Sequence, residues 1–142
     1  EDVRAVVSYT QEANVFAMVD AILESRGGVG QQLLQQLLKQ GASPAYLLVM
    51  LTRQLEIIVR VTELARQDKS RAEIQNRLGL TSDYVLRKAM EQAERYSLAR
   101  VREVYHRLLE ADLSLKTGRF DGELTLNLLV ADLCQQGAAL RR

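Results

Sequence analysis

Cysteine, histidine, proline and tryptophan are scarce in this sequence. Among its 142 residues there is one Cys, one His, one Pro and no Trp. The single cysteine, Cys134, excludes an internal disulfide and agrees with a reducing compartment such as the cytoplasm. One proline leaves room for long uninterrupted helices. Because only 5% of the residues are aromatic, the core must be built from aliphatic side chains.

Long apolar runs and an excess of charge of one sign are also missing. The longest apolar run, residues 45–51, is far shorter than the roughly 20 residues of a membrane-spanning helix. The 19 basic and 18 acidic side chains leave a net charge of +1, whereas nucleic-acid-binding domains usually carry a strong basic excess. We therefore expect no membrane association. The chain begins Glu1-Asp2-Val3 without Met or a signal sequence, and we expect it to be a piece of a longer protein.

Apolar residues recur at helical spacing through nearly the whole chain, and no segment alternates as a strand would. With 47% apolar residues the chain can bury a core, so we predict one all-α, irregular helical domain of about seven to eight helices. The part of the fourth helix that is apolar all round, residues 45–51, should be buried on every side. The predicted helices span residues 1–10, 14–25, 33–41, 44–67, 70–78, 82–96, 98–116 and 121–136.

Capping residues set these boundaries. Asn14 is predicted to cap the second helix, Ser43 with Pro44 to open the fourth, and Ser70 with Glu73 to form a capping box. Ser97 is predicted to cap the helix over residues 98–116. Glycines at positions 41, 79 and 118 are expected just after helix ends. The glycine-rich residues 26–30 lack the Lys-Ser/Thr of a phosphate-binding loop, and we expect a turn between helices there.

Residues 72–85 have the pattern of a helix-turn-helix DNA-binding motif, with a short helix, a Leu-Gly-Leu turn and a capped second helix. A recognition helix should present Arg, Gln or Asn in its first turn. Here those positions hold Ser82 and Asp83, and the carboxylate would repel phosphate, whereas Arg87 comes later. Base-specific DNA binding is therefore the minor alternative.

The sequence predicts no catalytic, cofactor or metal site. Glu103 and His106 match the Glu-x-x-His of di-iron bundles, but such a site needs two of these motifs and the chain has one His. Cys134 lies near the end of a leucine-rich helix, where a cysteine is usually a small buried apolar residue. No Cys–His pair is visible, and we expect no cofactor and no enzymatic activity.

An acid interrupts the apolar face of the helix over residues 98–116. In helical projection Asp112 falls near the middle of that face, and an unpaired buried carboxylate costs several kcal/mol. Lys116 lies four residues on, in the favourable order for an ion pair, so we predict a buried Asp112–Lys116 pair. Arg100, Glu103 and His106 project to the opposite, polar side. The apolar face comprises Leu98, Val101, Val104, Tyr105, Leu108, Leu109 and Leu115.

The turn over residues 116–121 is the one exposed place where the sequence suggests a ligand. Arg119 and Phe120 stand side by side, and such a pair can contact a phosphate and stack on a base. The residues themselves favour the alternative, in which Phe120 packs under the last helix.

Residues 110–118 (EADLSLKTG), together with residues 14–23 (NVFAMVDAIL) and the helix lengths between them, resemble the C-terminal part of the delta subunit of the bacterial DNA polymerase III clamp loader. The similarity runs from about residue 2 to about residue 133. It implies a helical collar domain over residues 12–142, preceded by the tail of an AAA+-like lid domain in residues 1–11. The additional glycine in residues 26–30 departs from the family and leaves the contacts of that loop open.

The resemblance implies a function in assembly rather than catalysis. In that family five subunits join through their collars, and the partners would be the other clamp loader subunits. The sliding clamp would be contacted only through an N-terminal domain that this chain lacks, and primer–template DNA would lie near Arg119 and Phe120. The rival classes are a helix-turn-helix regulator, which would bind duplex DNA in isolation, and an unrelated helical scaffold.

Overall fold

The computed structural model describes residues 2–118 and 121–140, with side chains over residues 11–118 and 121–135. Within these ranges the chain forms seven helices and no strands, which confirms the all-α, irregular domain. No described helix has the length and apolar character required to span a membrane. The helices are α1 (Asp2–Leu23), α2 (Gly27–Lys39), α3 (Pro44–Arg66), α4 (Arg71–Leu78), α5 (Asp83–Arg95), α6 (Leu98–Lys116) and α7 (Gly122–Leu140).

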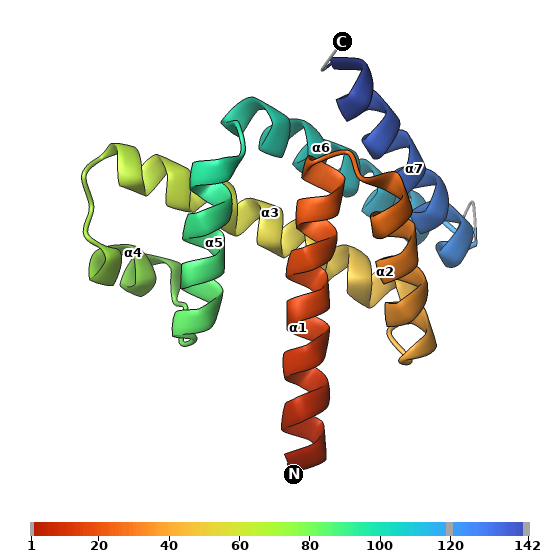
Figure 1. The fold of residues 1–142 in the computed structure, drawn as a ribbon, viewed down its shortest axis with the longest axis horizontal. Coiled ribbons are helices and arrows are strands. Elements are labelled where there is room, and N and C mark those ends of the chain that lie inside the picture. The colour runs from red at the N-terminus through yellow and green to blue at the C-terminus, as the bar shows by residue number, and fades with distance from the viewer. Residues whose placement is uncertain (1, 119–120, 141–142) are drawn as a thin grey trace.

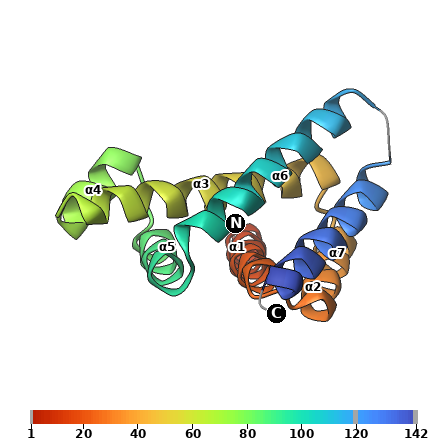
Figure 2. The ribbon, with the colours of Figure 1, turned by 90° about the horizontal axis from the view of Figure 1, so that it is seen from above.

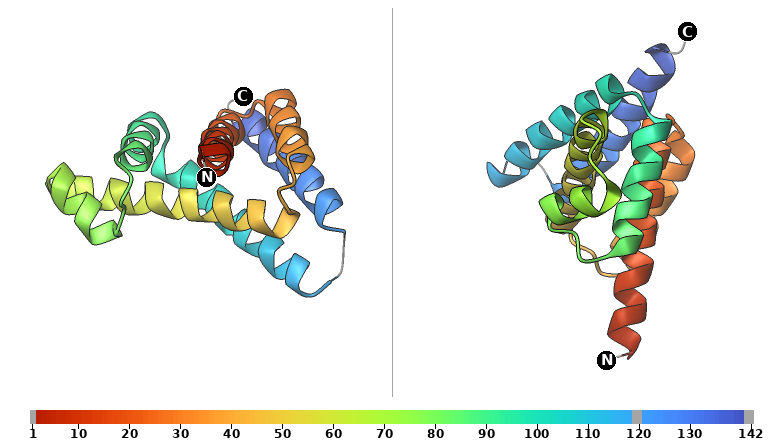
Figure 3. Two further views of the ribbon diagram at one scale, coloured as in Figure 1. Left: turned by 90° about the horizontal axis from the view of Figure 1, so that it is seen from below. Right: turned by 90° about the vertical axis from the view of Figure 1, so that its left-hand side faces the viewer.

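The long helix α3 is the axis on which the others are arranged. Seen from above, α4 and α5 lie at one end of α3, while α2 and α7 lie toward the other and α6 crosses over it (Figure 2). The N-terminal end of α1 extends beyond the other helices (Figures 1 and 3). The domain therefore has a broad end, built from α1, α2, α6, α7 and the start of α3, and a narrow end of α4, α5 and the end of α3.

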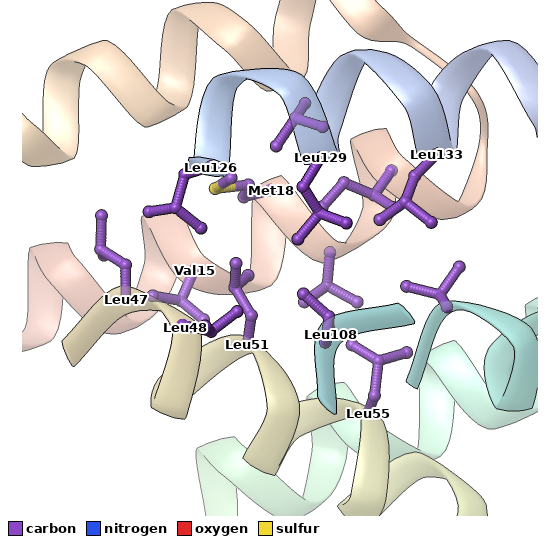
Figure 4. Packing of buried hydrophobic residues seen from close by; sticks show 14 of the residues in the cluster. Val15, Met18, Leu47, Leu48, Leu51, Leu55, Leu108, Leu126, Leu129 and Leu133 are labelled. Carbon is purple, nitrogen blue, oxygen red and sulfur yellow. The ribbon is translucent and has the colours of Figure 1, made fainter. Parts of the chain in front are cut away.

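Two hydrophobic clusters correspond to these two ends. The larger cluster joins α1, α2, α3, α6 and α7 through aliphatic side chains, among them Met18, Leu51 and Leu108 (Figure 4). The smaller cluster joins α3, α4 and α5 through Ile57, Val61, Ile74, Leu80, Leu86 and Ala89. The aliphatic core expected from the low aromatic content is therefore present, in two parts rather than one.

Most helix boundaries follow the predicted capping residues. The hydroxyls of Ser43, Ser70 and Ser97 each accept a hydrogen bond from the backbone N–H three residues on, at 3.1–3.2 Å. Gly79 and Gly118 end α4 and α6 with positive φ angles of 64° and 70°. These conformations are inexpensive only for glycine, which explains why the helices end there.

The two helices predicted over residues 1–10 and 14–25 are one helix, so that division is wrong. No Gly or Pro interrupts residues 10–14, and a helix-interior Asn costs less than 1 kcal/mol in propensity. Asn14 is therefore an interior residue of α1 rather than an N-cap. Its side-chain Nδ2 is buried without a hydrogen-bond partner among the described residues.

The predicted turn over residues 26–30 is also wrong in extent, because α2 begins at Gly27. Gly30 is buried where α2 meets α7, and a Cβ placed on it would lie 3.1 Å from Val130 Cγ1. The absence of a side chain at Gly30 thus allows α2 and α7 to lie close together.

Residues 45–51 are not buried on every side. Leu47, Leu48 and Leu51 face the larger cluster and are fully buried, whereas Tyr46 and Val49 remain 44% and 56% exposed. Residues of α1, α2, α6 and α7 join these three leucines in the larger cluster, so these helices pack on that side of α3. An aliphatic side of α3 is consequently left on the surface.

A buried set of hydrogen bonds ties α1, α3 and α5 together at the junction of the two clusters. Gln54 of α3 and Gln92 of α5 are each only 4% exposed, and Gln54 Nε2 donates to Gln92 Oε1 at 2.9 Å. Gln92 Nε2 in turn lies 3.3 Å from the Phe16 carbonyl oxygen and 3.0 Å from Asp20 Oδ1, both on α1. Each buried amide therefore has a partner, as a buried polar group requires.

Tyr96 extends this hydrogen-bond set toward solvent. Its hydroxyl lies 2.8 Å from Asp20 Oδ1 and 2.9 Å from Glu24 Oε1, so its one proton is shared between two carboxylates. Burial raises the pKa of the Tyr96 hydroxyl above its ordinary value of about 10, and the hydrogen bond to Asp20 raises it further, against a lowering by Arg95. The folded state therefore favours the neutral, protonated form of the Tyr96 hydroxyl.

Arg100 was predicted on the polar side of its helix, and that prediction is wrong. Its side chain is 12% exposed, and its Nη2 donates to the carbonyl oxygens of Ile22 at 3.1 Å and Leu133 at 2.8 Å. These carbonyls belong to the last turn of α1 and to α7. Arg100 therefore joins three helices through charge-assisted hydrogen bonds, while Glu103 pairs with it at 3.3 Å.

The predicted ion pair of Asp112 and Lys116 is present, with Asp112 partly buried and Lys116 exposed. Lys116 Nζ is 2.9 Å from Asp112 Oδ2, and the two side chains are 72% and 26% exposed. The buried face of α6 is narrower than predicted, because it consists of Val101, Val104, Leu108 and Ala111, while Leu109 is 40% exposed. Asp112 therefore lies at the edge of that face rather than in its middle: its carboxylate is mostly covered and paired as predicted, whereas Lys116 is exposed.

We expect Tyr96→Phe to lower the free energy of unfolding by about 1–2 kcal/mol near pH 7, because Asp20 and Glu24 lose a hydrogen-bond donor. Urea unfolding followed by circular dichroism measures this. Tyr105→Phe is the control, since the Tyr105 hydroxyl makes no hydrogen bond to a described residue. Because the folded-state pKa of Tyr96 is raised above its ordinary value of about 10, the contribution of the neutral hydroxyl is complete below about pH 10 and is lost as the pH rises above 10 toward the folded-state pKa. The wild type should then lose more stability than Tyr96→Phe above pH 10.

We expect Asp112→Ala to cost less than about 1 kcal/mol, because the lost ion pair is solvent-exposed. A double-mutant cycle with Lys116→Ala isolates the pair, and its coupling free energy should be about 0.3–0.5 kcal/mol. A loss of several kcal/mol in Asp112→Ala would contradict the surface position of this carboxylate.

Candidate functional site

The residues that could carry nucleophilic or metal chemistry are dispersed. Cys134 is buried at 5% exposure, and burial raises the pKa of its thiol although nearby Arg100 lowers it. A buried neutral thiol is a poor nucleophile. His106 is exposed on α6, and Glu103, its partner in the Glu-x-x-His pattern, pairs with Arg100. No group of three or more His, Cys, Asp or Glu side chains could hold a metal ion in the described part of the chain.

The predicted helix-turn-helix is formed by α4 and α5, but its first turn is engaged inside the molecule. The Ser82 hydroxyl accepts the Val85 N–H, and Asp83 Oδ1 lies 2.9 Å from Arg71 Nη2. Arg87 stands over the Tyr84 ring, with its guanidinium carbon 5.5 Å from the centroid. That ring packs edge-on against Phe16 of α1, at 5.5 Å between centroids. The face that would enter a DNA groove is thus partly used to hold α5 on α1.

The sequence-predicted candidates are not gathered into one site. Asp112 and Lys116 form a surface pair in the last turns of α6. Arg119 and Phe120, the DNA-proximal candidates, lie outside the described residues. Their proximity to DNA remains a prediction.

Exposed aliphatic side chains are the more prominent feature of the surface, and sequence reasoning did not anticipate them. They lie on α2, α3, α6 and α7, on helix faces turned away from the two clusters. For the two on α7, Leu124 and Leu128, the sequence signal was that residues 124–130 carry leucines on all sides of the helix. The exposed large apolar residues are Val29, Tyr46, Val49, Leu109, Leu113, Leu124 and Leu128.

A hollow of about 430 Å³ adjoins two of these helices. It lies between α6 and α7, and its lining includes the apolar side chains of Ala111, Leu128 and Leu129. The charged side chains at its margin are Arg107, Glu110 and Asp132. Arg107 makes ion pairs with both carboxylates, and these pairs fix the positions of the three charged side chains. Such a combination of exposed aliphatic residues and organised charge is typical of a protein-binding surface.

Comparison with known proteins places this fold in a family. Residues 12–133 match the family described as DNA polymerase III delta subunit, C-terminal domain. The chain is 26% identical over 136 residues to DNA polymerase III subunit delta of Bacillus subtilis, covering 96% of this chain and 39% of that protein. The solved structure of the Bacillus subtilis DNA clamp loader delta protein superposes with a TM-score of 0.79 at 26% identity, over 88% of this chain and 37% of that one.

These matches agree with one another in the family that they indicate and in the part of it that they cover. The chain spans 39% of the length of the Bacillus subtilis subunit that it resembles in sequence. The family model covers α2, α3 and α6 completely and α1 and α7 in part, so it includes every helix that contributes to the larger hydrophobic cluster. This chain therefore belongs to the family of the C-terminal domain of the DNA polymerase III delta subunit.

Proposed function

We propose that this chain is a non-catalytic assembly module of a clamp loader delta subunit. It would hold the subunit in the pentameric loader that places the sliding clamp on primed DNA in the cytoplasm. The observation that carries the proposal is the family match over residues 12–133, combined with the match of the fold to a clamp loader delta protein.

The surface supports a role in protein binding. The exposed leucines at positions 124 and 128 lie on α7, outside both hydrophobic clusters, and Leu128 also lines the hollow between α6 and α7. Burying such a side chain in an interface contributes about 1.5–3 kcal/mol each, whereas exposure to water gives the isolated domain nothing. The two leucines of α7 beside this hollow are therefore best explained by a partner that covers them.

The proposal keeps the predicted division of the chain. Residues 12–142 would be the collar domain, and residues 1–11 would belong to the tail of a preceding AAA+-like lid domain. The family match begins at residue 12, and α1 passes through this boundary as one helix. A continuous helix would transmit the orientation of the lid to the collar. The sliding clamp would be contacted only through the N-terminal domain of the subunit, not through the collar or the lid tail.

The helix-turn-helix regulator is the second class of function, and the structure offers it little support. Asp83 in the first turn of α5 is paired with Arg71, and Arg87 lies over an aromatic ring that packs on α1. A recognition helix needs these positions free to reach base edges.

Assembly is tested by co-expressing this chain, carrying an affinity tag, with the other clamp loader subunits of the same organism. We expect the chain to co-purify with them and to elute with them in size-exclusion chromatography. An unrelated tagged helical domain of similar size is the control. Elution of the chain alone, under conditions in which the other subunits assemble, would contradict the proposed function.

The predicted position of DNA is tested in the assembled loader with Phe120→Ala. If Phe120 stacks on a primer–template base, the substitution should weaken binding by about 1–3 kcal/mol, which fluorescence anisotropy measures. Arg87→Ala is the matched control on α5 and should leave the affinity unchanged. Unchanged DNA affinity in Phe120→Ala together with a lower melting temperature would assign Phe120 to the core instead.

A further inference from the structure

The outer face of α7 carries a second line of residues, parallel to the line that faces the core. Leu124, Leu128, Ala131 and Gln135 follow one another at spacings of four, three and four residues, and all are exposed. This spacing places them in one row along a helix and is the spacing used by helices that pack lengthwise on each other. Leu124 is 50% exposed and Leu128 61%. The opposite row, Leu126, Val130 and Leu133, is buried in the larger cluster.

The hollow between α6 and α7 lies beside this row of residues and shares Leu128 with it. Leu128 belongs both to the exposed row and to the lining of the hollow. Ala111 and Leu129, each 8% exposed, line it at the core side. A side chain that projects from a helix lying along α7 could therefore enter the hollow beside Leu128. We refer to the row 124–135 and this hollow together as the α7 surface.

The margin of the hollow has an excess of negative charge. Among the residues that the structure describes, Arg107 is the one cation in its lining, and it already makes ion pairs with Glu110 and Asp132. The Glu110 side chain is 76% exposed and that of Asp132 43%. One positive charge between two carboxylates leaves a net charge of −1, with carboxylate surface still open to solvent. A Lys or Arg from a partner is the group that this margin attracts.

We propose that the α7 surface binds an amphipathic helix of a neighbouring clamp loader subunit, with an aliphatic row against Leu124 and Leu128 and a basic residue over Glu110 and Asp132. This inference rests on the proposed function, because it supposes a neighbouring subunit. A second copy of this chain fits less well, since a twofold interface would bring the same carboxylates together from both sides. The exposed Leu109 and Leu113 are not part of the α7 surface, because neither lines the hollow that Glu110 and Ala111 of the same helix help to form.

The test compares Leu128→Glu with Leu113→Glu, a matched control on α6 with similar exposure, 61% against 65%. Each variant of this chain is titrated onto the immobilised complex of the other clamp loader subunits, and its helicity and melting temperature are recorded. We expect Leu128→Glu to bind about 10-fold or more weakly, because it places a charge in the centre of the contact. Leu113→Glu should bind within about threefold of the wild type. Glu110→Lys should also weaken binding and reduce its dependence on salt.

The outcomes separate this inference from the proposed function. If the wild-type chain does not bind the other subunits at all, the proposed function fails. If it binds and Leu128→Glu binds equally well, the α7 surface is not the interface, while the assembly role stands. A third outcome is that the wild-type chain self-associates in sedimentation experiments, whereas Leu128→Glu does not and still binds the other subunits normally. In that case the occupant of the α7 surface is a second copy of this chain, and the inference is overturned.

Discussion

The hydrogen bond between Gln54 and Gln92 is the contact on which the shape of this domain depends. Both amides are buried where the larger hydrophobic cluster gives way to the smaller one. Aliphatic contacts alone would let α5 slide along α1 and α3 at little cost, since hydrophobic attraction is non-directional. The Gln92 amide finds partners on both helices only in the observed register, with Asp20 and the Phe16 carbonyl on α1. A displaced register would leave buried amides unsatisfied, at about 1–3 kcal/mol each.

At the broad end, two small features set how the helices approach. Gly30 lets α2 lie close to α7, where a larger residue would meet Val130 at 3.1 Å. Arg100 reaches from α6 to carbonyl oxygens at the end of α1 and on α7. Because α1, α2, α3 and α6 contact α7 on its buried side, no helix of the described part of the chain covers the opposite side. The exposed leucines of α7 are therefore a consequence of how the domain closes on itself.

This distribution of polar groups suits an assembly module better than a catalyst or a DNA reader. The groups that could do chemistry are occupied in holding helices together: Arg100 on carbonyls, Asp83 on Arg71, and Tyr96 on two carboxylates. Exposed aliphatic side chains remain on the outside. The carboxylates of Glu110 and Asp132 give the surface beside α7 a net negative charge. The proposed partner is thus defined by complementarity to a surface rather than by a ligand pocket.

The sequence by itself was sufficient for the all-α class, for most helix boundaries and for the family resemblance, because caps, glycine stops and apolar spacing act within a few residues of chain. The sequence was misleading about burial, because the helices that cover a residue can be far from it in the sequence. Helical projection ranks faces by composition, and so it assigned Leu109 and Asp112 to the core and Arg100 to solvent, whereas the neighbours of α6 cover a narrower face centred on Val104 and Leu108. The tertiary structure alone decided which aliphatic rows meet a neighbour and which remain exposed, because each helix can bury only the side that another helix reaches.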